Sequence, residues 1–160
     1  MGSSLAGVGR ANITPLGPVR LEGYGRTGAS ARVLDPLSAT ALALAQDPAR
    51  PLLLISCDCV ALRVAECDAL RAAVSHALGT SVGRVLLFCT HTHSSPVVTP
   101  EYLDLLRERL VAAAAEAVAG LRPARIGWGA GEADARLIAR MGARAEAPAP
   151  DRTALAALPT

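Results

Sequence analysis

The sequence contains no lysine and very few aromatic residues. All sixteen basic residues are arginine, and only two tyrosines, one phenylalanine and one tryptophan occur among 160 positions. The formal net charge is +2 at pH 7, whereas proteins that bind nucleic acid or anionic membranes usually carry a strong basic excess. Binding of single-stranded nucleic acid also depends on aromatic side chains that stack on the bases. We therefore expect no nucleic-acid partner.

Long apolar runs and a secretory signal are also missing. A transmembrane helix needs about 20 consecutive apolar residues, and every uninterrupted apolar run in this sequence is much shorter. The residues that follow Met1 do not form a basic region with an apolar run behind it, as a signal peptide would. We expect a cytoplasmic protein with no transmembrane segment.

The four cysteines do not have the pattern of a disulfide framework. They lie close together in the sequence, in or beside apolar stretches, at Cys57, Cys59, Cys67 and Cys89. Small disulfide-rich secreted domains have a higher content of cysteine, spread along the whole chain. We therefore expect free thiols here. Two alternatives stay open, namely a zinc ion held by these thiols and a reactive pair of Cys89 with His91.

The sequence does contain enough apolar residues, 51%, for one domain with a hydrophobic core. Two continuous apolar runs, residues 51–56 and 84–89, are bounded by turn residues, as in strands that are buried on both faces. Residues 64–78 repeat apolar side chains every three or four positions, which predicts a helix. A connection of this length favours a parallel βαβ unit at about 51–89.

Further elements extend this unit to a whole domain. The patterns predict strands at residues 5–13, 39–45 and 124–129 and a helix at residues 101–119. A loop rich in glycine and proline is expected at residues 14–36. We predict an α/β fold with a mixed, largely parallel sheet and flanking helices, in a domain that spans residues 1–140. Residues 141–160, which are rich in alanine, proline and arginine, are expected to form a poorly ordered tail.

Polar residues that can bind a metal or carry out chemistry follow both apolar strands of the predicted unit. Asp58 comes after the first strand, and two of the three histidines, His91 and His93, come after the second. Because parallel strands place their carboxyl ends at one edge of the sheet, these residues should meet where ligands of open α/β sheets bind. This convergence is the strongest functional signal in the sequence.

The H-x-H spacing of His91 and His93 suits a metal ion. In extended backbone, residues i and i+2 point to the same side, so both rings can reach one ion at about 2.0 to 2.1 Å. Groups that could orient the rings from behind are available at Asp58, Thr90, Thr92, Ser94 and Ser95. A turn at this point would instead split the roles of the two histidines, or leave them as ordinary hydrogen-bonding loop residues.

Residues 23–28 spell the G-x-G-x-x-G pattern of dinucleotide-binding loops. That motif requires a strand before it and a helix that opens on its last glycine, and neither pattern surrounds residues 23–28. We interpret this segment as a loop that lines the edge of the site and whose glycines need unusual backbone dihedrals.

Several short segments occur in an order that points to one known family. They are residues 6–15 (AGVGRANITP), 23–25, 35–39, 55–58, 89–96 (CTHTHSSP) and 123–129. Over about residues 6–140 they resemble the N-terminal domain of the neutral/alkaline non-lysosomal ceramidases, and T-H-T-H-S after a buried strand is the most specific match. The resemblance implies a zinc-dependent amidohydrolase that cleaves the amide bond of ceramide.

The resemblance also implies roles for single residues. His91, the first histidine of T-H-T-H-S, corresponds to a zinc ligand of that family, and His93 to an active-site residue near the substrate. Zn²⁺ is therefore the expected cofactor and a ceramide-like lipid amide the expected substrate. The zinc would polarise the amide carbonyl and lower the pKa of a bound water to about 7, and His93 would hydrogen-bond the substrate or the developing oxyanion.

The sequence departs from the family pattern in both residues and length. Asn12 and Ser95 stand where the family has aspartate and glycine, and Leu34 stands where a histidine commonly precedes Asp-Pro-Leu. The family's other zinc ligands and the serine proposed to act at the amide come from later segments that have no counterpart here. We therefore expect a partial active site. The alternative is a folded, non-catalytic remnant or assembly module of the same family, and self-association is a third expectation.

Overall fold

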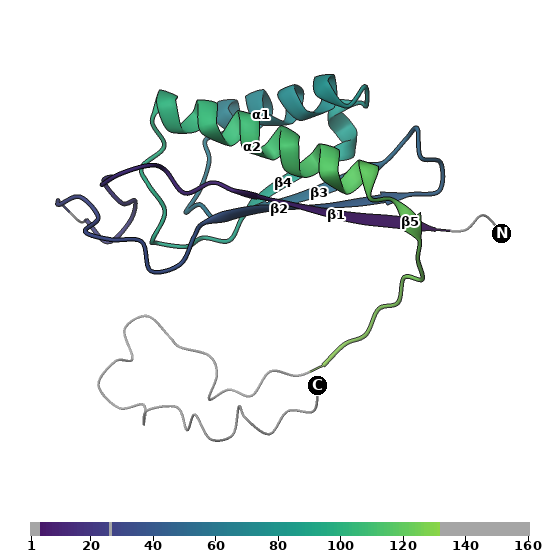
Figure 1. Ribbon diagram of the computed structural model, residues 1–160, viewed down its shortest axis with the longest axis horizontal. Helices are drawn as coiled ribbons and strands as arrows, with labels where there is room; N and C mark the ends of the chain where they lie inside the picture. The colour runs from purple at the N-terminus through teal and green to yellow at the C-terminus, as the bar shows by residue number, and fades with distance from the viewer. Residues whose placement is uncertain (1–3, 26, 132–160) are drawn as a thin grey trace. The chain divides into compact units, whose positions relative to one another are not determined.

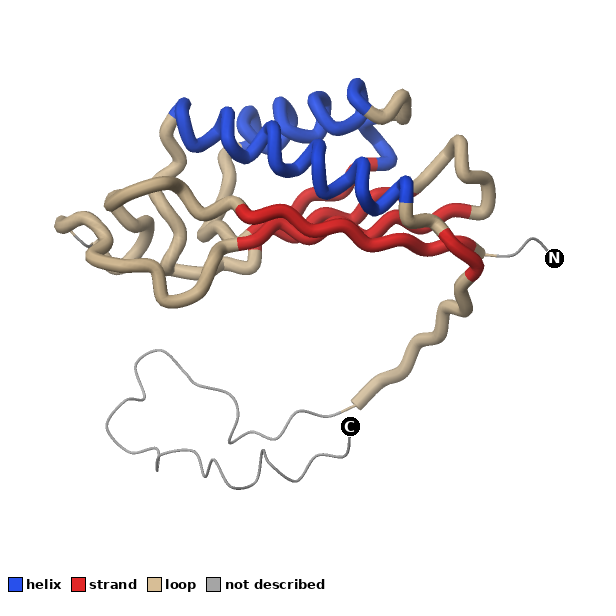
Figure 2. Tube along the Cα trace, in the orientation of Figure 1, coloured by secondary structure: helices blue, strands red, loops and turns tan. Residues whose placement is uncertain are grey.

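A computed structural model describes residues 4–25 and 27–131 of the chain. Its regular elements all lie in a unit that ends at Ile126, and they are β1 (Leu5–Asn12), β2 (Ser38–Ala45), β3 (Leu52–Cys57), α1 (Val64–Ala77), the 3₁₀ turn η1 (Val82–Arg84), β4 (Val85–Cys89), α2 (Pro100–Ala119) and β5 (Arg122–Pro123). One five-stranded sheet has the order β4-β3-β2-β1-β5. Both helices lie on the same face of this sheet (Figure 1, Figure 2). The predicted α/β class with a mixed sheet and flanking helices is confirmed.

The predicted βαβ unit is present, but it supplies the only parallel pair among the described strands. β3 and β4 run parallel, with Cys57 opposite Cys89. The other pairings, β1 with β2, β2 with β3 and β1 with β5, are antiparallel. The expectation of a largely parallel sheet is therefore wrong in its proportion. A parallel pair needs a long crossover connection, usually a helix. Among the described strands, β3 and β4 are the sheet neighbours joined through a helix, because β4 and β5, which α2 joins, lie at opposite edges of the sheet.

The strand expected at residues 124–129 is also not formed. Only the two residues of β5 pair with β1, as Pro123 opposite Leu5 and Arg122 opposite Ala6. Because this pairing is antiparallel, each further residue of the chain would need a partner earlier than Leu5, where β1 begins. The apolar side chains of this segment stay exposed instead, with Trp128 96% exposed.

The helices bury the faces that their periodicity predicts, with one exception. In α1, Leu70 and Val74 are buried, whereas Val64, the first helical residue, is 79% exposed. In α2, Leu106 and Leu110 are completely buried. Pro100 stands at the first helical position and Gly120 follows the last, as the sequence indicates.

Small residues let α2 lie unusually close to the sheet. Ala39, Ala41 and Ala43 of β2 are fully buried beneath the helices. In β1, a Cβ atom at Gly7 or Gly9 would come within 2.1 Å of a backbone carbonyl oxygen of α2. The 33 alanines of the chain thus include residues whose small size sets the distance between the two layers.

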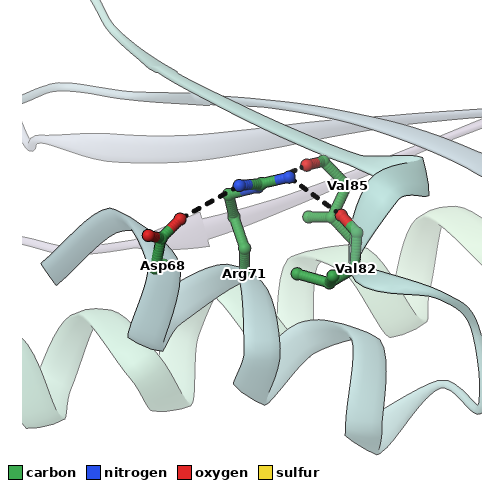
Figure 3. A network of polar contacts seen from close by, with 4 residues as sticks. All are labelled: Asp68, Arg71, Val82 and Val85. Carbon is green, nitrogen blue, oxygen red and sulfur yellow. Dashed lines mark hydrogen bonds and ion pairs between the residues drawn. The ribbon is translucent and has the colours of Figure 1, made fainter. Parts of the chain in front are cut away.

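Arg71 ties α1 to the start of β4. Its guanidinium donates from Nε to the carbonyl oxygen of Val85 at 2.8 Å and from Nη2 to that of Val82 at 3.0 Å. Asp68, one turn earlier on α1, pairs with Nη1 of Arg71 at 3.1 Å. Figure 3 shows the guanidinium between these three groups. The contacts fix where β4 begins, and therefore where its carboxyl end meets the loop after β3.

The expectation that β3 and β4 are buried on both faces is wrong for the described residues. Burial alternates along β3, where Leu53 and Ile55 are fully buried but Leu52 and Leu54 are only half-buried. In β4, Phe88 is 47% exposed. The helices cover one face, and nothing in the described part of the chain covers the other in the same way.

None of the described helices is both long enough and apolar enough to cross a membrane. The division at residue 140 and the tail expected at 141–160 fall outside the described residues.

Candidate functional site

The predicted polar residues meet at the carboxyl ends of β3 and β4. The ladder between these strands continues past their ends, because the backbone amide of Thr90 donates to the carbonyl oxygen of Cys57 at 2.9 Å and that of His91 to Cys59 at 3.0 Å. The segment after β4 is thereby held against the loop after β3. The fold thus brings His91 and His93 to the same edge as Asp58, as the parallel pair requires.

His91 is held in an unusual backbone conformation and a defined ring orientation. Its φ is +64°, a left-handed value that is uncommon for residues other than glycine and that clusters at functional sites. Its ring nitrogen Nδ1 lies 2.9 Å from the carbonyl oxygen of Val60. A carbonyl only accepts hydrogen bonds, so Nδ1 carries the proton, and the lone pair on Nε2 of the neutral ring can accept from Nε2 of His93.

His93 faces His91 across a short gap. The two Nε2 atoms lie 3.3 Å apart, and the ring planes are almost perpendicular, at 85°. On its other side the His93 ring stacks on Tyr24, with 4.3 Å between the ring centroids. The Nε2 atoms of both histidines therefore point toward the same small region.

The loop of residues 14–37 forms the wall behind His93. The backbone amide of Glu22 donates to the carbonyl oxygen of Ser95, and that of Val97 to Arg20, both at 2.9 Å. Gly23 has φ +78°, and a Cβ there would lie 2.2 Å from Nδ1 of His93. The G-x-G-x-x-G segment thus lines the edge of the site at Gly23, as the sequence interpretation proposed.

Asp58 acts as a clamp between three segments rather than as a direct neighbour of the imidazole rings. Its Oδ2 accepts hydrogen bonds from the backbone amide and the hydroxyl of Ser38, at 2.8 and 3.0 Å. Its Oδ1 accepts one from the hydroxyl of Thr90 at 3.1 Å. Asp58 thereby joins the start of β2 to the residue that precedes His91.

Val60 and Tyr24 make contacts that the sequence patterns did not predict, whereas Ser95 is one of the hydroxyl residues expected to support the rings. Ser95 is completely buried; its hydroxyl oxygen accepts from the amide of Val60 at 3.0 Å and donates to the carbonyl oxygen of Thr92 at 3.3 Å. Val60 in turn holds the His91 ring. The serine at position 95, where the family pattern has glycine, supplies the hydroxyl that makes both contacts.

A cavity of about 530 Å³ adjoins this cluster. It lies between the loop of residues 14–37 and the segment after β4, and the polar residues on its wall include Asp58, Thr92, Ser94 and Arg32 but neither histidine. Much of the remaining wall is apolar, including Leu21 and Val33. Its size and mixed lining are those of small-molecule sites.

The four cysteines are free, as expected. Cys57 and Cys59 are buried, and a hydrogen bond to Cys59 together with burial raises the pKa of the Cys57 thiol well above its ordinary range. Burial raises the pKa of the Cys89 thiol to about 11. A reactive nucleophile needs a lowered pKa, so these values argue against a Cys89–His91 pair.

We expect Cys89 to react slowly with alkylating reagents. At pH 8, a thiol with a pKa of about 11 exists as thiolate in roughly one molecule in a thousand, about a hundredfold less than an ordinary thiol. Iodoacetamide labelling followed by mass spectrometry should therefore modify Cys89 about a hundredfold faster in urea than in the folded protein. Equal rates in both states would show that Cys89 is neither buried nor shifted.

The donor set fits part of a metal site. Two nitrogen ligands at about 2.0 Å from one tetrahedral zinc lie about 3.3 Å apart, which matches the distance between the Nε2 atoms of His91 and His93. Within residues 4–25 and 27–131, however, no group of three or more His, Cys, Asp or Glu side chains could hold a metal ion. The same finding gives no support to a zinc ion on the thiols.

The fold and this edge define an α/β protein with a histidine cluster at the ends of a parallel strand pair. Solved structures of neutral ceramidases have a similar fold. The neutral ceramidase from Pseudomonas aeruginosa matches with a TM-score of 0.62 and 21% identity, over 77% of this chain and 22% of that one. A ceramidase complexed with C2 matches with a TM-score of 0.61 and 19% identity, over the same shares.

These similarities support a ceramidase-like fold. No family model matches the sequence, and no curated protein matches it. The chain spans about a fifth of the length of the two ceramidase structures.

Proposed function

We propose that this chain carries the first part of a zinc site for hydrolysis of a lipid amide, with His91 as a metal ligand. The observation that carries the proposal is the 3.3 Å separation of the Nε2 atoms of His91 and His93. Ceramidase-like topology around that pair supports the reaction class.

His91 has the features of a metal ligand. The carbonyl oxygen of Val60 fixes its Nδ1 proton, so Nε2 is the atom left to bind a cation, as in zinc proteins whose ligands are oriented by a backbone carbonyl. Asp58 acts one step further away, because it holds Thr90, the residue before His91. Asp58 and Thr90 are thus positioning residues.

His93 is suited to the substrate side of the site. Stacking on Tyr24 fixes its ring, and its Nε2 lies close enough to a group bound at His91 to share the ion or to hydrogen-bond a ligand on it. Thr92 and Ser94 line the neighbouring cavity and offer hydroxyls to a polar headgroup. The apolar wall would hold part of an acyl chain.

A zinc ion bound there would supply Lewis acidity toward the amide carbonyl and a bound water with a pKa near 7. The residues of this chain would orient the amide and exclude water around it. Hydrolysis adds water across the C–N bond, so the acyl carbon leaves as a carboxylate and the nitrogen, after taking a proton, as an amine. His93 is the side chain we assign to the hydrogen bond with the carbonyl oxygen during this step.

A second candidate is a non-catalytic module of the same fold. It is favoured by one observation, that the described residues provide two imidazole nitrogens and no group of three metal ligands. Catalytic zinc sites usually have three protein ligands. In this case the chain would bind zinc weakly, if at all, and would not turn over a substrate alone.

Zinc titration of the whole 160-residue protein distinguishes these functions. We expect calorimetry to detect one zinc per chain, and His91→Ala to weaken binding at least tenfold, because half of the nitrogen donors are removed. His76→Ala is the matched control, since His76 is an exposed histidine on α1, and it should leave zinc affinity unchanged.

Release of fatty acid from a short-chain ceramide should be measured on the same samples. Turnover that His91→Ala and a chelator both abolish would support the hydrolase. Zinc binding without turnover would support the non-catalytic module. A parent protein that binds zinc no better than His91→Ala would contradict the metal assignment and leave the non-catalytic module as the function.

A further inference from the structure

The uncovered face of the sheet is the largest feature that the site leaves unexplained. Its residues follow from the register: Val8 lies opposite Leu42, Leu42 opposite Leu54, and Leu54 opposite Leu86. These four residues form an apolar row across β1, β2, β3 and β4. Val8 is 61% and Leu86 45% exposed, and the two leucines between them are half-buried.

The sequence of β3 and β4 is not that of strands with one solvated face. An antiparallel sheet with one wet face alternates apolar and polar residues, whereas nearly continuous apolar runs are typical of strands covered on both sides. β3 and β4 have such runs, LLLISC and VLLFC. Monomers rarely expose contiguous apolar patches of more than a few hundred Å², so this face calls for a partner.

We propose that the partner is a second copy of this chain, packed sheet to sheet. Two faces can meet about a two-fold axis that runs parallel to the strands, and this axis places β4 of each copy over β1 of the other. Leu86, at the bulky edge, then lies over Val8, and Leu54 lies over Leu42. Large side chains meet smaller ones at both ends of the row, so the face is complementary to itself.

The next row of residues supports this arrangement. Arg10 of β1, Thr40 of β2, Ser56 of β3 and Phe88 of β4 lie in one register row. The same axis places Arg10, whose Nη2 donates to the hydroxyl of Ser38 at 3.2 Å in its own copy, opposite the 47%-exposed Phe88 of the other copy, and it does so twice. A cation over an aromatic face is attractive, whereas an axis that crossed the strands would bring Arg10 against Arg10.

The size of the face is sufficient for a weak dimer. Four strands about 4.8 Å apart, with five residues each at about 3.3 Å rise, give a footprint of roughly 300 Å² per copy. Two copies therefore bury at least about 600 Å² before the relief of the side chains is counted, which is below the roughly 1,200 Å² of stable complexes and in the range of weak, transient contacts. We expect a dissociation constant in the micromolar range.

Sedimentation velocity of the full chain at about 1 to 300 µM tests the proposal. The parent should pass from monomer to dimer in this range, and Val8→Glu and Leu86→Glu should each raise the dissociation constant at least tenfold. Val64→Glu is the control, because Val64 is an exposed apolar residue on α1, and Leu86→Met should retain the dimer. Circular dichroism checks that the variants fold, since the substituted side chains are exposed.

Cross-linking tests the axis. A mixture of Val8→Cys and Leu86→Cys proteins should give a mixed dimer with a short bismaleimide, whereas the parent, with its native thiols, should give none. A parent that stays monomeric at 300 µM would overturn the proposal. A dimer that survives both glutamate substitutions, or one that cross-links only as Val8→Cys with itself, would also overturn it.

Discussion

Gly9→Ala should reduce the free energy of unfolding by about 3 kcal/mol or more. A Cβ at position 9 would lie 2.1 Å from the carbonyl oxygen of Ala113 and 2.7 Å from the backbone nitrogen of Ala117. Both atoms belong to the backbone of α2, so rotation of a side chain cannot relieve the clash. The helix would have to move away from β1 by about 1 Å or more, and overpacking that forces backbone shifts costs up to about 3 kcal/mol, occasionally more.

Movement of α2 would also disturb contacts beyond β1. Glu116 of this helix accepts a hydrogen bond from the backbone amide of Arg10 at 2.9 Å, and the buried Leu106 and Leu110 lie on the same helix. Urea unfolding followed by circular dichroism should show a lower midpoint for Gly9→Ala with an unchanged slope.

Gly83→Ala is the matched control for Gly9→Ala. A Cβ at position 83 would meet nothing within 4 Å, so this substitution should change stability by no more than about 0.5 kcal/mol. Similar midpoints for the two variants would contradict the close approach of α2 to the sheet.

Local patterns predicted most of the regular elements because each pattern depends on the residue's own neighbours. One shared core buries the periodic apolar residues of α1 and α2 and part of the apolar runs of β3 and β4. The same patterns could not tell which faces are covered. A continuous apolar run indicates two buried faces, yet in β3 only the side of Leu53 and Ile55 is covered by the described residues. The patterns also did not determine whether neighbouring strands run parallel or antiparallel, because this depends on how the strands are connected and not on their composition.

The site was predictable to the extent that topology determines it. A parallel βαβ unit brings the ends of β3 and β4 together, so the sequence alone places Asp58 and the histidine pair at one edge. The contact of Tyr24 with His93 could not, because it depends on how the loop of residues 14–37 crosses that edge. Backbone hydrogen bonds from Glu22 to Ser95 and from Val97 to Arg20 define this path, and no local pattern encodes them.

Gly23→Ala should displace the His93 ring and reduce zinc affinity at least tenfold. A Cβ at position 23 would lie 2.2 Å from Nδ1 and 2.9 Å from Cε1 of His93, so ring and methyl group cannot occupy their places together. The backbone adds a second cost, because φ +78° is a left-handed value that disfavours residues with a Cβ by roughly 1–2 kcal/mol. Displacement would separate His93 from Tyr24 and from Nε2 of His91.

Gly17→Ala separates the steric effect from the backbone effect. Gly17 has nearly the same φ, +79°, but a Cβ there would meet nothing within 4 Å. Both variants should therefore bear a similar conformational cost, while only Gly23→Ala shifts the ring-proton resonances of His93 through loss of the Tyr24 stack. The NMR measurement reports the ring position without any metal, so it tests the geometry even if zinc binding fails. Unchanged His93 resonances in Gly23→Ala would mean that the loop around position 23 moves and the His93 ring does not. Zinc affinity would then stay at the parent value, and the predicted displacement would be wrong.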